Sequence, residues 1–247
     1  MQSIISGDTH IGMGSAPELV TAVNAGAKVR GVWGISNLMP YALISRPHIR
    51  TINDLKGKKI AVSSRGSLSE FLANYALKNK GMDPSRDVTY ISMGGVPTRF
   101  AAILSGAADA SLISAAQFER GKESGAEFSF DVIRDSPGMA TGPHLSAGGD
   151  VHQSRAGVHR AYRRGIATAK KNPELTIAAM QNAMRFDLPT ARDGYAAYVQ
   201  SLPDDGHMAE KGLELLVDQM AQDGTVKKGL GLSDLIDYRF IHEAQRK

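Results

Sequence analysis

The sequence of 247 residues contains no cysteine and few aromatic residues. Without cysteine the chain has no disulfide, no thiolate ligand for a metal and no cysteine nucleophile. Aromatic residues make up 6% of the chain, with a single tryptophan, which argues against a site that cages quaternary ammonium groups. No apolar run approaches the roughly 20 residues of a membrane-spanning helix. The hydrophobic content of 42% and charged content of 22% are those of a globular protein.

The excess of positive charge is small and is concentrated in one segment. The chain has 29 Lys and Arg against 25 Asp and Glu, a formal net charge of +4. Residues 155–171 hold six of the basic residues and no acid, and one helix face there carries Arg160, Arg163, Arg164 and Lys171. A solvated basic face explains this pattern, and an acidic partner or nucleic acid is the alternative. Tyr162 is the one interleaved aromatic residue, so base stacking has little support. We expect no nucleic-acid partner.

The first half of the chain alternates apolar runs with helical patterns, which indicates strand–helix–strand units and a mainly parallel sheet. We predict strands at residues 10–14, 29–35, 59–63, 88–92, 108–113 and 128–134, and helices at residues 17–24, 67–80, 98–104 and 115–123. From about residue 152 the pattern is almost entirely helical, with four helices marked by apolar residues at helical spacing. The glycines and prolines between residues 136 and 149 predict a crossover between two bodies.

A modest internal repeat supports two bodies of similar build. With a shift of 99 positions, residues 4–27 match residues 103–126 at seven of 24 positions without a gap. Both segments have the order Ser-Gly turn, strand, serine at a helix start, helix and Gly-Ala. We predict two lobes of related architecture, and chance similarity between generic units is the alternative.

Three predicted strand-to-helix junctions begin with Ser-x-x-Glu or Ser-x-x-Gln, at Ser15, Ser67 and Ser114. This is the capping-box pattern, in which the serine hydroxyl accepts a first-turn N–H and the acid or amide returns to the serine N–H. Helix capping alone explains the pattern. Ligands of open parallel sheets also lie outside the carboxyl ends of the strands, where helix N-termini favour an anion. The junctions are therefore candidate ligand contacts as well.

The second junction carries the most specific signal. Arg65 can supply a two-donor fork to a carboxylate, sulfonate or phosphate, and Gly66 lets the backbone approach a ligand closely. A solvated loop arginine is the alternative. The loop is not a Walker A motif, which would need Gly-x-x-x-x-Gly-Lys-Ser/Thr. Ser36 and Asn37 follow another predicted strand, where a turn asparagine explains the pattern as well as a ligand contact does.

No part of the sequence has the spacing of a metal site or a catalytic site. The seven histidines are scattered, with no pair at ligand spacing. Neither a Gly-x-Ser-x-Gly elbow nor a complete dinucleotide fingerprint occurs. We therefore expect no metal, no cofactor and no enzymatic activity.

Six segments of the chain carry a common family pattern. They are residues 52–62 (INDLKGKKIAV) with 65–67 (RGS), residues 81–84 (GMDP) with 87–88, residues 101–110 (AAILSGAADA), residues 6–15, residues 169–174 and residues 234–237. In their order and spacing these segments resemble the solute-binding proteins of ABC importers in the nitrate, sulfonate, taurine and thiamine-precursor group. The resemblance covers nearly the whole chain.

The resemblance implies an α/β fold: a two-lobed clamshell of the periplasmic-binding-protein type, with mainly parallel sheets flanked by helices and a helical C-terminal region. Lobe one would comprise residues 1–43 and 140–247, and lobe two residues 44–139. The ligand would lie in the cleft between the lobes. Carried over by position, the ligand-binding candidates are Gly14, Ser15, Ser36, Asn37, Arg65, Gly66, Ser67 and Ser114.

The resemblance also implies a function and a location. A periplasmic protein of this kind binds a small anionic or polar solute (a sulfonate, nitrate, carboxylate or pyrimidine-like molecule) and delivers it to the permease of an ABC importer, without a catalytic step. A ligand-sensing module, or an enzyme on the same fold like a pyrimidine-precursor synthase, is the alternative. Genes for a permease and an ATPase beside this one would favour transport, and a kinase or regulator would favour sensing.

The chain departs from the family pattern at its start. Family members begin with a signal peptide and then a further strand and helix of the first lobe, whereas this chain opens near the end of that unit. We expect the missing strand to leave sheet edges exposed, and therefore poor monomer stability or a dimer through strand edges. Light scattering that shows a stable, monodisperse monomer would contradict this expectation.

Overall fold

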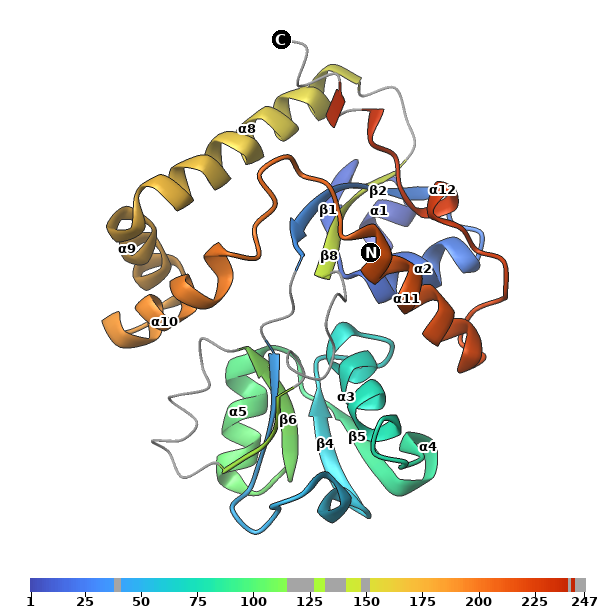
Figure 1. The fold of residues 1–247 in the computed structure, drawn as a ribbon, viewed down its shortest axis with the longest axis vertical. Coiled ribbons are helices and arrows are strands. Elements are labelled where there is room, and N and C mark those ends of the chain that lie inside the picture. The colour runs from blue at the N-terminus through green and yellow to red at the C-terminus, as the bar shows by residue number, and fades with distance from the viewer. Residues whose placement is uncertain (38–40, 115–126, 132–140, 148–151, 240, 243–247) are drawn as a thin grey trace. The chain divides into compact units, whose positions relative to one another are not determined.

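The structure is a computed structural model that describes residues 1–37, 41–114, 127–131, 141–147, 152–239 and 241–242, and side chains up to residue 113 and from residue 157 (Figure 1). The chain divides into two compact units. Unit 1 comprises Met1–Met39, Gly138–Thr176 and Tyr198–Lys247, and unit 2 comprises Pro40–Pro137 and Ile177–Ala197. Residues 177–197 thus group with unit 2, whereas the sequence analysis assigned them to lobe one. The predicted lobe boundaries stay a prediction, because the second crossing lies outside the described residues.

Unit 1 is built on a three-stranded sheet in the order β1-β8-β2. Its strands are β1 (Ile11–Met13), β8 (Thr141–Ala147) and β2 (Val29–Ser36). Strand β8 pairs antiparallel with both neighbours, so β1 and β2 point in the same direction on either side of it. Helix α2 (Ala16–Asn24) joins β1 to β2. The predicted strand–helix–strand unit is confirmed, with one strand inserted into it.

That inserted strand, β8, was not predicted. It lies within the stretch that the glycines and prolines assigned to a crossover, and Pro143 is paired with Gly34 in its ladder. Proline lacks the N–H that a central strand normally donates, so the sequence pattern argues against a strand here. The stretch was predicted as a crossover between two bodies, and within it residues 141–147 form a strand of unit 1.

The helices of unit 1 follow the apolar periodicity of the sequence. Besides α2, unit 1 contains α1 (Gln2–Ile5), α8 (His152–Lys171), α11 (Glu210–Gln222) and α12 (Leu232–Leu235). Two further predicted helices, α9 (Pro173–Met184) and α10 (Leu188–Val199), span the points where the chain passes between the units. Trp33, Ile166 and Ile241 form one core cluster of unit 1. Trp33 is completely buried.

Unit 2 contains a five-stranded mixed sheet. Its order is β5 (Val88–Ser92), β4 (Lys58–Val62), β6 (Ala110–Ser114), β3 (Tyr41–Ser45) and β7 (Glu127–Asp131). Strand β4 is parallel to β5 and to β6, and β3 is antiparallel to β6 and to β7. The carboxyl ends of β4, β5 and β6 therefore meet at one edge of the sheet, where β3 begins. We call this the carboxyl edge of unit 2.

Helices α3 (Leu68–Lys78) and α5 (Val96–Ser105) each follow a parallel strand and begin at the carboxyl edge. The short helix α4 (Pro84–Asp87) precedes β5, and a 3₁₀ helix, η1 (Ile52–Leu55), precedes β4. Ile44, Ile103 and Ile113 form a buried cluster; each such side chain stabilises the fold by about 1.5–3 kcal/mol on burial. The helix predicted at residues 115–123 lies outside the described residues.

The two units confirm the predicted α/β class. The parallel pairing that the sequence predicted holds for β4, β5 and β6, while the other pairs are antiparallel. In the described part of the chain, no helix has the length and apolar character needed to cross a membrane. The same residues contain no group of three or more His, Asp or Glu side chains arranged to hold a metal ion.

Candidate functional site

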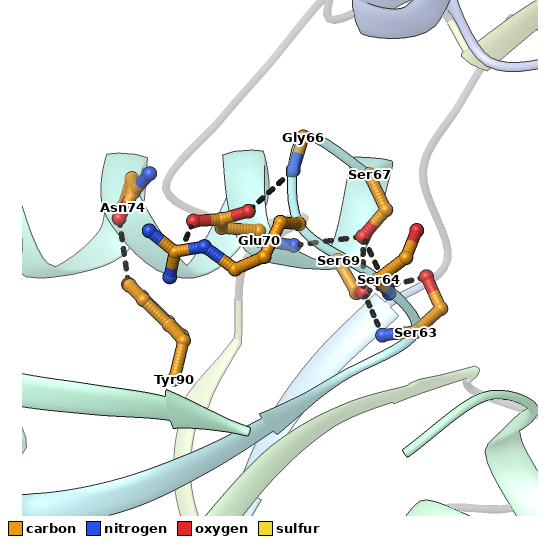
Figure 2. A network of polar contacts seen from close by, with 9 residues as sticks. Ser63, Ser64, Gly66, Ser67, Ser69, Glu70, Asn74 and Tyr90 are labelled. Carbon is orange, nitrogen blue, oxygen red and sulfur yellow. Dashed lines mark hydrogen bonds and ion pairs between the residues drawn. The ribbon is translucent and has the colours of Figure 1, made fainter. Parts of the chain in front are cut away.

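Three serine hydroxyls form a network where β4 passes into α3 (Figure 2). The hydroxyl of Ser69 lies at its centre: it accepts the Ser63 N–H at 2.8 Å and lies 3.1 Å from Ser63 Oγ and 3.0 Å from Ser67 Oγ. Ser67 Oγ also accepts the Glu70 N–H at 3.5 Å, as the N-cap of α3. This cap was predicted from the sequence, whereas Ser69 was not, although Ser-x-Ser at a helix start was a visible signal.

Glu70 occupies the position in which an anion would be expected at this junction. Its carboxylate accepts the Gly66 N–H at 2.5 Å and forms an ion pair with Arg65 at 2.9 Å. The acid of the predicted capping box therefore returns to Gly66 rather than to Ser67. The Glu70 side chain is 10% exposed and that of Arg65 67%, so Arg65 is an exposed arginine with its charge already balanced.

Tyr90 completes the surroundings of this ion pair. The Arg65 guanidinium lies 5.4 Å from the centre of the Tyr90 ring, and the Tyr90 hydroxyl donates to Asn74 Oδ1 at 2.6 Å (Figure 2). Burial, with the Glu70 carboxylate as second cause, raises the pKa of the Tyr90 phenol well above its usual range, and Arg65 opposes the rise. Tyr90 is thus a neutral hydrogen-bond donor over the whole physiological pH range.

At the matching junction in unit 1, between β1 and α2, the serine is hydrogen-bonded to the glutamate of its own helix. The Ser15 N–H and the Ser15 hydroxyl both donate to Glu18 Oε2 at 2.9 Å. Gly14, immediately before, is half-buried. The capping box predicted at this helix start is confirmed, and the Ser15 hydroxyl in addition donates to the acid.

Ser36 and Asn37 make hydrogen bonds within unit 1. Ser36 Oγ donates to Ser201 Oγ at 2.7 Å. Asn37 donates from Nδ2 to His207 O and accepts the Ala209 N–H at Oδ1, both at 3.0 Å. These bonds attach the end of β2 to residues 201–209, which is a structural role. Contact of Ser36 or Asn37 with a ligand stays a prediction.

The structure brings four of the eight candidates to one edge. Arg65, Gly66 and Ser67 lie in the loop after β4, and Ser114 ends β6 opposite Tyr41 of β3, so all four are at the carboxyl edge of unit 2. The side chain of Ser114 lies outside the described part of the structure. Gly14, Ser15, Ser36 and Asn37 belong to unit 1.

Arg99 is a residue of the carboxyl edge that the sequence analysis missed. It is 3% exposed and lies in the first turn of α5. Burial lowers the pKa of its guanidinium and raises that of the Tyr41 phenol, and the two side chains interact electrostatically. Arg99 shares the buried face of α5 with Ala102 and Ile103. A charged residue at i with apolar residues at i+3 and i+4 was the signal that could have identified it.

The predicted basic face of α8 is exposed. Arg160, Arg163 and Arg164 line an open hollow of about 380 Å³ together with Ala167 and Asp204. Asp204 is paired with Lys170 at 2.7 Å, whereas the three arginines have no ion pair with any residue the structure describes. The arrangement is that of a solvated basic surface.

Solved structures share this fold. The periplasmic aliphatic sulphonate binding protein SsuA from Escherichia coli is 20% identical, with a TM-score of 0.71 over 96% of this chain and 78% of that one. The alkanesulfonate-binding SsuA from Xanthomonas axonopodis pv. citri, bound to MOPS, is 17% identical, with a TM-score of 0.78 over 96% and 83%. A protein from Bordetella bronchiseptica RB50 is 18% identical, with a TM-score of 0.80 over 99% and 83%. The predicted periplasmic-binding-protein fold is confirmed.

A family model extends the comparison from fold to descent. No curated protein matches the chain. The model described as NMT1/THI5 like matches residues 1–176, which is well over half of the sequence and includes the complete junction between β4 and α3 as well as α5. The chain therefore belongs to the NMT1/THI5 like family.

Proposed function

We propose that the protein is the solute-binding component of an ABC importer, located in the periplasm, and that it delivers a small anionic or polar solute to a permease without a catalytic step. The family supports this proposal, as do the two SsuA structures, both of which are sulfonate-binding proteins by name. Sulfonates, nitrate, carboxylates and pyrimidine-like molecules are the solutes to test.

The observation that carries the proposal is the serine network at the carboxyl edge of unit 2. Ser67 and Ser69 are 4% and 5% exposed, and their hydroxyls are held in place by each other and by the Ser63 backbone. Ligands of open parallel sheets lie outside the carboxyl ends of strands, and hydroxyls that are held in place in advance lose little entropy when a ligand binds. The remaining candidates, Gly14, Ser15, Ser36, Asn37, Arg65, Gly66 and Ser114, stay proposed contacts.

The proposal is tested by titrating the full chain with a panel of sulfonates, nitrate, carboxylates and pyrimidines. The readouts are calorimetric heat and melting temperature; Trp33 is fully buried within unit 1, so its fluorescence is a poor reporter for unit 2. We expect one solute class to bind saturably and to raise the melting temperature, since a ligand that binds only the folded state stabilises it. A panel in which no solute produces heat or a melting shift would count against the proposal.

Replacement of the cap serine tests the site itself. Ser67→Ala is expected to weaken solute binding about tenfold, the typical effect of one lost hydrogen bond at a buried polar site, and to lower the free energy of unfolding by about 1 kcal/mol through loss of the α3 cap. The control is Ser85→Ala. Ser85 also lies at a helix start, where its hydroxyl donates to Asp83, but α4 precedes β5 and so lies at the opposite edge of the sheet. Equal loss of affinity in both variants would contradict the assignment of the site.

A further inference from the structure

Arg99 is a buried cation without an acidic partner in the described part of the chain. Its side chain donates from Nε to Ser111 Oγ at 3.1 Å, from Nη2 to Leu112 O at 3.0 Å and from Nη1 to Gly94 O. All three acceptors are neutral. A buried charge loses its hydration, and proteins normally compensate that loss with an opposite charge. The described surroundings of Arg99 supply hydrogen bonds but no such charge.

The position of Arg99 adds to this unfavourable electrostatic balance. The first turn of a helix carries partial positive charge, which disfavours a cation. Helix α5 starts after Gly95, which has no side chain to cap it. No residue that the structure describes accepts the N–H groups of Val96 or Thr98. The start of α5 therefore combines the Arg99 guanidinium with backbone N–H groups that have no described acceptor. No described residue supplies a negative charge to balance them.

Gly94, which accepts a hydrogen bond from Arg99, is also bonded to the loop of the serine network. Gly94 is exposed, and a Cβ added to it would meet no atom within 4 Å. The Gly94 N–H donates to Ser63 O at 3.1 Å, while the Gly94 carbonyl accepts from Arg99. One residue thus connects the arginine to the loop that holds Ser67.

A second described arginine of this edge is in the opposite situation. Arg65 is 67% exposed, and its guanidinium is paired with Glu70 at 2.9 Å. An anion could bind Arg65 only by displacing a carboxylate that also accepts the Gly66 N–H. Of the two arginines, Arg99 is therefore the one whose charge is left for a ligand.

We infer that Arg99 is the cation that binds the solute, and that the solute carries an oxyanion group such as a sulfonate, carboxylate or nitrate. The inference rests on the proposed function and narrows it to anions. A guanidinium has five N–H donors, and three are used by the protein, so one remains on each of Nη1 and Nη2. Two donors in one plane can bind two oxygens of the oxyanion group. The N–H groups of Val96 and Thr98 are further donors to the same group.

A purely structural role for Arg99 makes different predictions. The same three hydrogen bonds join α5 to β6 and to the loop after β5. If they were the only purpose of Arg99, its replacement would reduce stability and leave the affinity for anions unchanged in molecules that are still folded. Affinity and stability therefore have to be measured separately.

The test is a calorimetric titration of the full chain with methanesulfonate, nitrate and acetate. We expect Arg99→Gln to bind the preferred anion roughly 100-fold more weakly, since it loses a charge-assisted pair of hydrogen bonds. Arg99→Lys is expected to bind about tenfold more weakly, because it keeps the charge without the planar fork. Arg86→Gln is the matched control and should stay within about threefold of the unmodified chain, because Arg86 lies in α4 at the opposite edge of the sheet and is already paired with Asp83 at 2.9 Å. Circular dichroism and melting curves establish that each variant is folded.

A second measurement does not depend on any variant. In the unmodified chain labelled with ¹⁵N, the Nε–H resonance of Arg99 should shift on addition of the anion and saturate with the dissociation constant found by calorimetry. A folded Arg99→Gln variant with unchanged affinity, or an Nε resonance that does not shift, would overturn the inference. If only neutral pyrimidines bind, the inference fails and the proposed function stands. If no solute of the wider panel binds, both fail.

Discussion

Gly206→Ala is expected to lower the free energy of unfolding by about 3 kcal/mol, which is the combined effect of overpacking and of an unfavourable backbone conformation. Gly206 has φ of +81°, a region that residues with a Cβ rarely adopt, and an added Cβ would overlap the six-membered ring of Trp33. Trp33 is fully buried, so its ring cannot move aside into solvent. The Gly206 carbonyl also accepts the Gly34 N–H at 2.7 Å, which limits backbone movement.

Gly224→Ala separates the two causes. Gly224 has φ of +70°, but a Cβ there would meet no atom within 4 Å. This variant should lose only about 1 kcal/mol, the penalty of the left-handed conformation. Urea unfolding of both variants, followed by circular dichroism, measures the difference. Equal losses would show that the contact of Gly206 with Trp33 is not tight in solution.

Asn37→Ala is expected to lower the free energy of unfolding by about 2 kcal/mol, because two backbone groups lose a hydrogen-bond partner at once. The Asn37 amide bonds both His207 O and the Ala209 N–H, in a segment more than 160 residues away along the chain. Its own N–H donates to Ser201 O at 2.8 Å, and the substitution leaves this bond in place. Loss of the side chain should therefore loosen residues 207–209 without unfolding unit 1.

The control for Asn37 is Asn24→Ala. Asn24 Oδ1 accepts a single exposed bond, from the Lys227 N–H at 2.9 Å, so the loss should be within about 1 kcal/mol. Chemical unfolding gives the stability, and hydrogen exchange at Ala209 reports on the local opening. If Asn37→Ala leaves both unchanged, the hydrogen bonds described for Asn37 do not contribute to stability, and its role as a ligand contact becomes the better explanation.

Elements with a strong local pattern were predicted from the sequence. Strand β5 was placed at residues 88–92 as the structure has it, and the starts of α2 and α3 carried their capping serines. The strands that were missed, β3 and β8, depend on distant partners. Strand β3 is a five-residue run between Pro40 and Pro47 that pairs with β6 and β7. A short apolar run flanked by prolines has no periodicity that distinguishes a strand from a loop.

Only part of the candidate site was predicted, because some of its contacts depend on residues that are distant in the sequence. Gly66 and Ser67 could be identified from local chemistry, because a glycine and a capping serine follow a predicted strand. The pairing of Arg65 with Glu70 depends on a loop conformation in which Gly66 has φ of +74°, and local spacing pointed instead to a bond with Ser67. The helical spacing of Arg99 with Ala102 and Ile103 indicates a shared face, but its hydrogen bonds depend on β6 and on the loop after β5. Which side chains are buried by elements distant in the chain cannot be predicted from local sequence patterns.

Mapping the bound solute onto the backbone tests the central claim, that the carboxyl edge of unit 2 binds it. The measurement is a ¹H–¹⁵N amide spectrum of the full chain during titration with the tightest solute of the panel. Saturable shifts are expected at the amides of residues 63–70 and of residues 94–96, 98 and 99, in the two junctions joined by the bond from the Gly94 N–H to Ser63 O. Saturable binding that leaves both junctions unshifted would contradict the claim.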